Sequence, residues 1–446
     1  MTFHLQTTKY LVLAAALAAT SAPTPADAAD LGKAGGDCCA DLEARVADLE
    51  ASAARTGNKK VELKISGRVN AGVLWWSDGF GAKDLRDPAV FDSNTNVYVV
   101  NNSMNRTKVD IEGTGKIREG WSAGFSMSLR PWGSNLDKVS QIDHNPKPGD
   151  IGVENTYVFI EAEAIGKLQL GLQDGAANEA WGQDLGGSSS WLTSVNSGDW
   201  NASFHLRDAT GRLTDMTWDS VLSDFGDAQE PRLMFSSREV AGFHVAASVG
   251  GQRSYAAALF YAQSYGKVSV AAAVAYDVST GSDALDSQAA GYGLVDMDHD
   301  KLAKFAGSLS VYESGSGLYG SLAWSHVASD MAGRSGASNA YGKLGWRKNV
   351  LGWGETNVYA EADRTTAAYA DDTSAHMVGL GVTQDIDAAA AVIYLGYRHT
   401  ALDNSIAGAS LVPTAAQTAG GLAPTPAGLV PAQQFDAVLA GMVLQF

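Results

Sequence analysis

The chain has 446 residues and a formal net charge of −17, from 32 Lys and Arg against 49 Asp and Glu. Nucleic-acid binding needs a basic surface that neutralises phosphates, so this acidity argues against a nucleic-acid partner. With only two cysteines, disulfides do not hold the fold together. Beyond the N-terminus no apolar run reaches the about 18 residues of a membrane-spanning helix, which argues against a helical membrane protein.

The N-terminus has the pattern of an export signal. Lys9 precedes an apolar stretch at 10–19, and a polar, proline-containing region follows and ends at Ala26-Asp27-Ala28. This order is typical of a secretory signal peptide, and the apolar stretch is too short to span a bilayer. We therefore expect residues 1–28 to be removed after Ala28 and the rest of the chain to be exported.

Residues 29–58 are expected to form a periplasmic linker and a short coiled-coil helix. The seam residues follow one another at spacings of three and four: Cys39, Leu42, Val46 and Leu49. A helix this short is marginal alone, which favours association with identical neighbours, although an amphipathic linker is the alternative. The adjacent Cys38 and Cys39 can bridge neighbouring chains or remain free thiols.

From residue 59 onward the hydrophobic period changes to two. Apolar or small residues alternate with polar ones from Val61 to Trp75, and the alternation returns at 121–130, 168–172, 243–249, 268–276 and in later segments, giving about sixteen strands. Several segments approach the about ten residues that a tilted strand needs to cross a bilayer. The pattern predicts an all-β fold, a transmembrane antiparallel β-barrel over residues 59–446, with a soluble sandwich or propeller as the alternative.

The chain ends on an aromatic residue, Phe446, which shares one strand face with Val438, Ala440, Met442 and Leu444. With the export signal, the coiled coil, the strands and the segments 38–50, 61–70 and 166–175, this ending resembles the general bacterial porin family, in its alphaproteobacterial-type branch. The resemblance implies a homotrimer in outer-membrane lipid that passes ions and small hydrophilic solutes passively. It also implies that the barrel-assembly machinery recognises Phe446, and it calls for no cofactor and no catalytic activity.

Residues 176–230 interrupt the strand pattern for longer than ordinary loops do. The resemblance implies that part of this segment folds into the lumen and narrows it, whereas an extracellular loop is the alternative. We expect a basic wall of Lys64, Arg68, Arg106, Lys108 and Arg130 to face acids of the loop, namely Asp184, Asp199, Asp208, Asp215 and Asp219. Such an arrangement sets a field across the pore, and the overall acidity predicts a weak preference for cations.

Motifs for catalysis or metal binding are weak. The eight histidines are scattered without the spacing of a zinc or hydrolase motif. Asp296-Met-Asp-His-Asp300 offers alternating carboxylates but lacks the glycine and glutamate of a calcium-binding loop, so no metal is expected. Two other functions stay open: a substrate-selective channel of the same fold, and a structural tether of the outer membrane acting through the coiled coil.

Overall fold

The computed structural model describes residues 60–446 except 81–93, 132, 147–150, 196, 224, 226–228, 252–253, 281–300, 330–335 and 413–424. The predicted signal peptide, the coiled-coil seam with Cys38 and Cys39, and the acidic run 296–300 lie outside the described residues. Among the residues that are described, no helix is long and apolar enough to cross a membrane.

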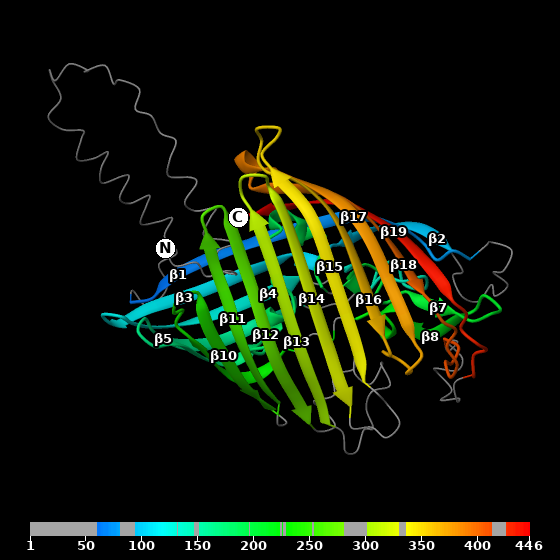
Figure 1. Ribbon diagram of the computed structural model, residues 1–446, viewed down its shortest axis with the longest axis horizontal. Helices are drawn as coiled ribbons and strands as arrows, with labels where there is room; N and C mark the ends of the chain where they lie inside the picture. Colours follow the sequence, from blue (N-terminus) through cyan, green and yellow to red (C-terminus); the bar gives the residue numbers. More distant parts are fainter. Residues whose placement is uncertain are drawn as a thin grey trace.

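The described chain forms a closed barrel of antiparallel strands (Figure 1). The strands are β1 (Glu62–Ser77), β2 (Thr95–Asn101), β3 (Lys108–Arg118), β4 (Trp121–Pro131), β5 (Ile151–Ala162), β6 (Gly166–Gln173), β9 (Glu230–Ser237), β10 (Phe243–Gly250), β11 (Tyr255–Tyr265), β12 (Val268–Thr280), β13 (Lys301–Glu313), β14 (Leu318–Ser329), β15 (Ala337–Lys348), β16 (Thr356–Thr366), β17 (Ser374–Ile386), β18 (Ala391–Leu402) and β19 (Gln433–Gln445). Each neighbour in this series pairs antiparallel, apart from β2 and β3, and β6 pairs with β9 although a long segment separates the two strands in sequence. The prediction of an antiparallel barrel is confirmed.

One barrel strand is built from two pieces. The second half of β1 pairs with β2, and its first half pairs with β3. Between them lies η1 (Ser103–Asn105), a single 3-10 turn capped by the Asn102 side chain. When β2 and β3 count as one strand, the described residues form a barrel of sixteen strands, the number expected from the sequence.

The first and last strands close the barrel. β1 pairs with β19 from Arg68 to Ser77, and the main chains of Gly67 and Phe446 exchange two hydrogen bonds, of 2.9 and 3.0 Å. A closed sheet leaves no unpaired edge, which is what a β-structure in lipid requires. The aromatic C-terminus therefore lies at the seam where the barrel closes.

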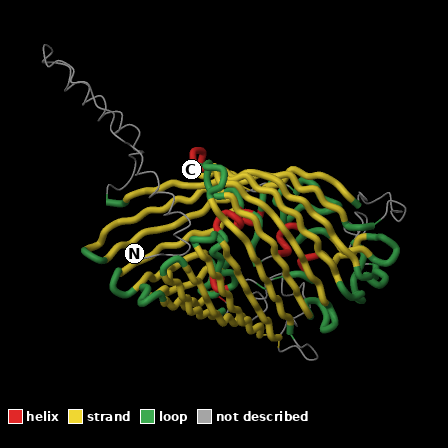
Figure 2. The backbone as a smooth tube through the Cα atoms, turned by 45° about the horizontal axis from the view of Figure 1, so that its top comes forward, coloured by secondary structure: helices red, strands yellow, loops and turns green. Residues whose placement is uncertain are grey.

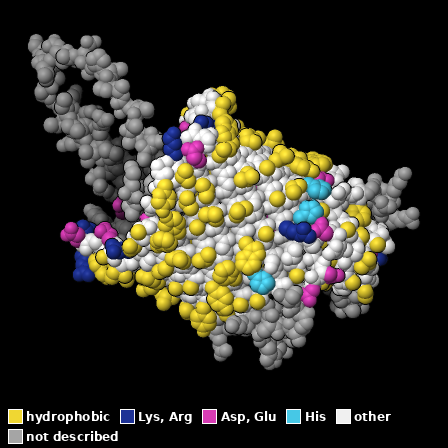
Figure 3. Space-filling view, viewed as in Figure 1, with side chains coloured by type: hydrophobic (Ala, Val, Ile, Leu, Met, Phe, Trp, Pro, Cys, Tyr) yellow, Lys and Arg dark blue, Asp and Glu magenta, His cyan; other side chains and the backbone are white. Residues whose placement is uncertain are grey.

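Alternation places two kinds of side chain on the two faces of the wall. In β16, Val358 and Ala360 are exposed on the outside, whereas Tyr359 and Glu361, which alternate with them, are buried on the inside. Figure 3 shows the result as a largely apolar outer surface. The turns at one end are short, such as 163–165 and 387–390, and the segments at the other end are long, which places the short turns on the periplasmic side.

Part of the barrel interior is filled by the chain itself. The segment 174–229, between β6 and β9, contains the short turns η2 (Asn178–Ala180), η3 (Gly187–Trp191), η4 (Ser197–Trp200) and η5 (Trp218–Ser220) and the hairpin β7 (His205–Arg207) and β8 (Leu213–Thr217). Figure 2 shows these helical turns inside the ring of strands. We call this segment the constriction loop.

Candidate pore constriction

The first half of the constriction loop lies along the inner face of β13 to β18. Ser308 and Ser310 of β13 accept hydrogen bonds from the main chain of Gln183 and Leu185, both at 2.9 Å. Farther along, the Asn357 side chain of β16 donates to the main chain of Gly186, and the hydroxyl groups of Ser188 and Thr383 of β17 lie 2.6 Å apart. The loop is therefore fastened to one side of the wall at several points.

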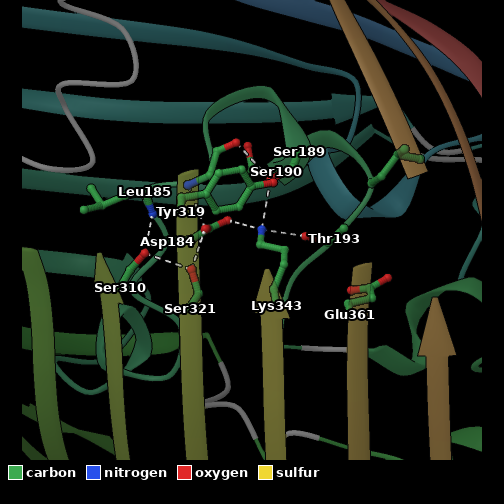
Figure 4. Close-up of polar contacts among 12 residues, drawn as sticks. Asp184, Leu185, Ser189, Ser190, Thr193, Ser310, Tyr319, Ser321, Lys343 and Glu361 are labelled. Atoms are coloured by element: carbon green, nitrogen blue, oxygen red, sulfur yellow. Dashed lines mark hydrogen bonds and ion pairs between the residues drawn. The ribbon is translucent and has the colours of Figure 1, made fainter. Parts of the chain in front are cut away.

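Lys343 of β15 is the central anchor of this contact (Figure 4). Its Nζ lies 2.6 Å from Asp184 Oδ2 and donates to Ser189 Oγ and Thr193 Oγ1, both at 2.9 Å. Only 1% of the lysine side chain is exposed. A buried ammonium with three oxygen partners is satisfied only while the loop stays in place, so the anchor couples the position of the loop to a buried charge.

A second buried ion pair lies beside this anchor, because its Glu361 is directly opposite Lys343 in the register of β15 and β16. Arg398 of β18 and Glu361 of β16 are 2.8 Å apart between Nε and Oε1, and both side chains are almost fully buried. Arg398 also donates to the main chain of Leu192, and its guanidinium lies 4.6 Å from the ring centre of Trp200. A Cβ at Gly396 would lie 2.8 Å from the same ring, so the loop packs this closely on β18 because a glycine stands there.

The second half of the loop builds an apolar cluster inside the extracellular half of the barrel. Phe204 packs between Trp76 of β1 and Phe435 of β19, with ring centres 4.8 Å apart in both pairs. The β7–β8 hairpin continues outward and forms a bridge between Thr214 and Leu411 of the segment 403–432. The lumen beside β1, β2 and β19 is therefore occupied at this level.

A fully buried ion pair fixes the base of that hairpin. The Arg207 guanidinium lies 2.8 Å from Asp78, which directly follows β1, and donates to the main chain of Gly211. Burial raises the pKa of the Asp78 carboxyl above its usual range, although the charge of Arg207 and hydrogen bonds from Arg207, Phe80 and Gln141 oppose the increase. The desolvation of Asp78 is thus only partly offset by its partner.

Four of the five predicted basic residues converge on β1, β3 and β4. Lys108 Nζ and Arg130 Nη1 share Glu154 of β5, at 3.8 and 3.7 Å, and Lys108 also lies 3.0 Å from Asp110. Arg68 donates to the main chain of Arg106 at 2.9 Å. Lys64 is exposed near the periplasmic end of β1, away from this group.

The acid opposite Arg106 comes from the segment 133–146, not from the constriction loop. Asp137 Oδ2 lies 3.1 Å from Arg106, and Asp137 Oδ1 accepts a hydrogen bond from Ser103. Burial raises the pKa of the Asp137 carboxyl, but the charges of Arg106 and Lys138 and the bond from Ser103 together lower it below its usual range. The carboxylate is therefore held in its charged form.

The predicted loop acids are not collected opposite the basic wall. Asp184 pairs with Lys343, Asp208 pairs with Arg212 within the hairpin at 2.9 Å, and Asp215 accepts from the main chain of Ser410. Asp199 lies in η4 and Asp219 in η5, both partly exposed. One contact between the loop and the basic wall is instead aromatic: the Arg68 guanidinium lies 5.6 Å from the ring centre of Trp191.

Sequence reasoning missed the residues that hold the loop. They are Asp78, Arg207, Lys343, Glu361 and Arg398 for the ion pairs, and Asp137 and Glu154 for the partners of the basic wall. Alternation places Lys343, Glu361 and Arg398 on the inner face, so a search for charged residues facing the lumen would have found them. No period in the sequence indicates which of them the loop covers.

Comparisons with known proteins agree with this architecture. The family model of Gram-negative porins matches residues 13–405. The anion-selective porin from Comamonas acidovorans is 13% identical, with a TM-score of 0.54, over 86% of this chain and 100% of that one. OmpT of Vibrio cholerae, folded in vitro, is 12% identical, with a TM-score of 0.51, over 88% of this chain and 100% of that one.

No protein of curated function matches the sequence. The two structural likenesses are distant in sequence and support the barrel fold, whereas the family model covers most of the chain. The chain therefore belongs to the Gram-negative porin family, and it forms an outer-membrane channel for passive diffusion.

Proposed function

We propose that ions and small hydrophilic solutes pass between the first half of the constriction loop and the wall of β3 to β5. The observation that carries this proposal is the anchoring of the loop to the opposite wall, above all through Lys343 and Asp184. Lys108, Arg130 and Glu154 then line the other side of the passage, where both cations pair with Glu154. Passive diffusion down a gradient needs no cofactor and gives the chain no catalytic step.

The charges at this passage are close to balance. The four converging cations Arg68, Arg106, Lys108 and Arg130 stand beside the three carboxylates Asp110, Asp137 and Glu154. The local field of such a nearly balanced group orients polar solutes without excluding cations or anions. The chain as a whole carries a net charge of −17, so its mouths attract cations over about a Debye length, and we propose a weak cation preference.

Planar-bilayer recording of the purified, folded protein tests both points. We expect stepwise, ohmic currents. In a potassium chloride gradient we expect a small reversal potential whose sign shows a preference for cations. A folded protein that inserts but carries no current would contradict the proposed passage. A reversal potential that favours anions would contradict only the ion preference, because the passage itself would still conduct.

We also propose that the channel is a homotrimer. Within the described residues, β2 has a strand ladder with β1, and its other edge has main-chain bonds at Asn101, to Ser134 and Leu136. Farther along this strand Val97 and Val99 are exposed, Val99 at 72%. An unpaired strand edge facing lipid leaves backbone groups unsatisfied, whereas a neighbouring subunit can cover it. Native gels should show one species of three chains, and bilayer recordings should show channel closures in groups of three. A stable monomer that conducts by itself would contradict the trimer.

A further inference from the structure

The inner wall of β1 to β6 carries a second group of charges in its periplasmic half, below the basic wall described above. These side chains face the lumen, because they alternate with residues exposed to lipid such as Ile65, Ile160 and Leu168. The group consists of three cations and three carboxylates, namely Glu62 and Lys64 of β1, Glu112 and Lys116 of β3, Glu161 of β5 and Lys167 of β6. We call it the mixed-charge strip.

The charges of the strip stand side by side without pairing. Strand register puts Lys64 directly opposite Glu112, and Glu161 directly opposite Lys167. Directly opposite side chains lie within reach of one another, yet none of the six forms an ion pair with another residue in the part of the chain that the structure describes. Because Glu112 is exposed and Lys167 is partly exposed, their charged ends are accessible to a solute in the lumen.

Two aromatic rings hold the ammonium of Lys167 in place. Its Nζ lies 4.1 Å from the ring centre of Phe159 and 5.6 Å from that of Tyr157. The two rings follow one another on the inner face of β5, about 7 Å apart along the strand, and both are partly exposed. A cation over an aromatic face is attracted by the ring and keeps its N–H donors for other partners. The ammonium is therefore positioned, and its donors still face the lumen.

Small residues separate this ammonium from the carboxylate of Glu112. On β4, between β3 and β5, the inward residues next to the rings are Gly124 and Ser126. A Cβ at Gly124 would lie 2.6 Å from a ring carbon of Phe159, so the ring lies close against β4 because a glycine stands there. In the next row Ser126 alone lies between Glu112 and Tyr157, whose strands are two spacings, about 10 Å, apart. A small solute can therefore touch both sides at once.

The charge of the strip selects a dipolar solute over an ion. Its three cations balance its three carboxylates, so the strip as a whole attracts neither sign. A solute with one charge meets one attractive and one repulsive partner, whereas a zwitterion can satisfy Glu112 and Lys167 together. An α-amino acid carries its ammonium and its carboxylate on one carbon, and its side chain can lie against the two exposed rings.

We propose that the mixed-charge strip is a weak binding site for zwitterionic amino acids with apolar side chains. Glu112 accepts hydrogen bonds from the ammonium of the solute, and Lys167 donates to its carboxylate. Tyr157 and Phe159 contact the apolar side chain. The inference names a solute class for the proposed passage and rests on it. Weak binding suits a channel, because a solute must leave the site as well as enter it.

Ligand-observed saturation-transfer NMR of the folded protein in detergent tests the site without any current. The probes are phenylalanine, phenethylamine, which keeps only the ring and the ammonium, and 3-phenylpropionate, which keeps only the ring and the carboxylate. The signal from empty micelles is subtracted. We expect phenylalanine to bind about tenfold more tightly than either analogue, a difference of about 1.4 kcal/mol. Any other order of affinity, or no binding, would overturn the proposal.

Variants show whether the strip is responsible. Lys167→Met should reduce the affinity for phenylalanine to that for phenethylamine, and Glu112→Gln should reduce it to that for 3-phenylpropionate. The matched controls are Lys348→Met, at the exposed end of β15, and Glu239→Gln, in the turn between β9 and β10, and both should bind as the unmodified protein does. If Lys167→Met does not fold, Glu112→Gln decides alone. Unchanged affinity in the strip variants would refute the site.

Bilayer recordings separate a failure of this site from a failure of the passage. We expect phenylalanine to reduce the current of the unmodified channel in the concentration range in which it binds, and to have about a tenfold weaker effect on Lys167→Met. If the channel conducts and phenylalanine binds without changing the current, the site lies outside the passage and this inference fails, whereas the passage stands. If the inserted protein binds phenylalanine in the expected order but carries no current, the passage fails and the site is supported.

Discussion

Lys343 and Asp184 lie 2.6 Å apart and join the barrel wall to the constriction loop across 159 residues of sequence. Lys343→Met removes the ammonium that lies 2.6 Å from Asp184 and donates to Ser189 and Thr193. Breaking a buried ion pair by removing one partner typically costs about 3–5 kcal/mol, part of which the loop can recover here by moving into water. We expect larger and noisier single-channel currents, because the loop no longer stays against β15.

The matched control is Lys348→Met, at the exposed periplasmic end of the same strand, which should conduct as the unmodified channel does. The double variant Lys343→Met/Asp184→Asn should be quieter than Lys343→Met alone, since no charged group is then left unpaired. Equal noise in all variants would show that the ion pair does not hold the loop.

Replacing Arg130 or its partner Glu154 should shift the reversal potential in opposite directions. Arg130→Gln removes a cation from the proposed passage and should move the reversal potential in a salt gradient toward cations. Glu154→Gln leaves Lys108 and Arg130 without their common partner and should move it toward anions. Shifts of the same sign, or none, would mean that permeating ions do not pass this group.

The buried pair of Asp78 and Arg207 should matter more for stability than the pair of Asp208 with the half-exposed Arg212, because Asp208 keeps its hydrogen bonds from Thr210 when the Arg212 side chain is replaced. Asp78→Asn removes the carboxylate that lies 2.8 Å from Arg207, whose side chain is 0% exposed, a loss of about 3–5 kcal/mol. Arg212→Gln, at a side chain that is 45% exposed, should cost about 0–1 kcal/mol. Proteolysis of the extracellular loops with increasing temperature compares the two variants, and equal protection would contradict the prediction.

The wall of the barrel could be predicted from the sequence because two different environments act on it. Lipid on one side and water or loop on the other select residues with a strict period of two, as from Val61 to Trp75, and β1 spans Glu62–Ser77. The interruption at η1 has no such signal. It depends on Asn102, Asn105 and Thr107, whose polar side chains bond to the loop and to β1 and look like ordinary lumen residues in the sequence.

The path of the constriction loop could not be predicted for a related reason. Its position depends on single long-range pairs, such as Arg398 with Glu361 and Asp184 with Lys343, that a one-dimensional pattern does not connect. The acidity of the segment was visible, but Asp208 folds its own hairpin by pairing with Arg212. Composition thus indicated a charged loop, whereas the partners of each charge required the structure.

Acidification should loosen the β7–β8 hairpin. Burial lowers the pKa of the His205 imidazole below its ordinary value of 6.5, against the opposing effects of the Thr214 carbonyl and the Asp215 carboxylate, and Arg207 lowers it further. In a released hairpin His205 has its ordinary pKa of about 6.5, so between this value and the lowered pKa the released hairpin binds more protons than the docked one. The docked hairpin therefore has its full stability above about pH 6.5 and loses it as the pH falls through the lowered pKa. Lowering the pH on the extracellular side should consequently increase closures or loop cleavage below about pH 6.5. His205→Gln should flatten this pH dependence, because it removes the titrating ring. The control His326→Gln, on the outer surface, should leave the pH dependence intact. An unchanged pH profile in His205→Gln would assign the effect to other groups.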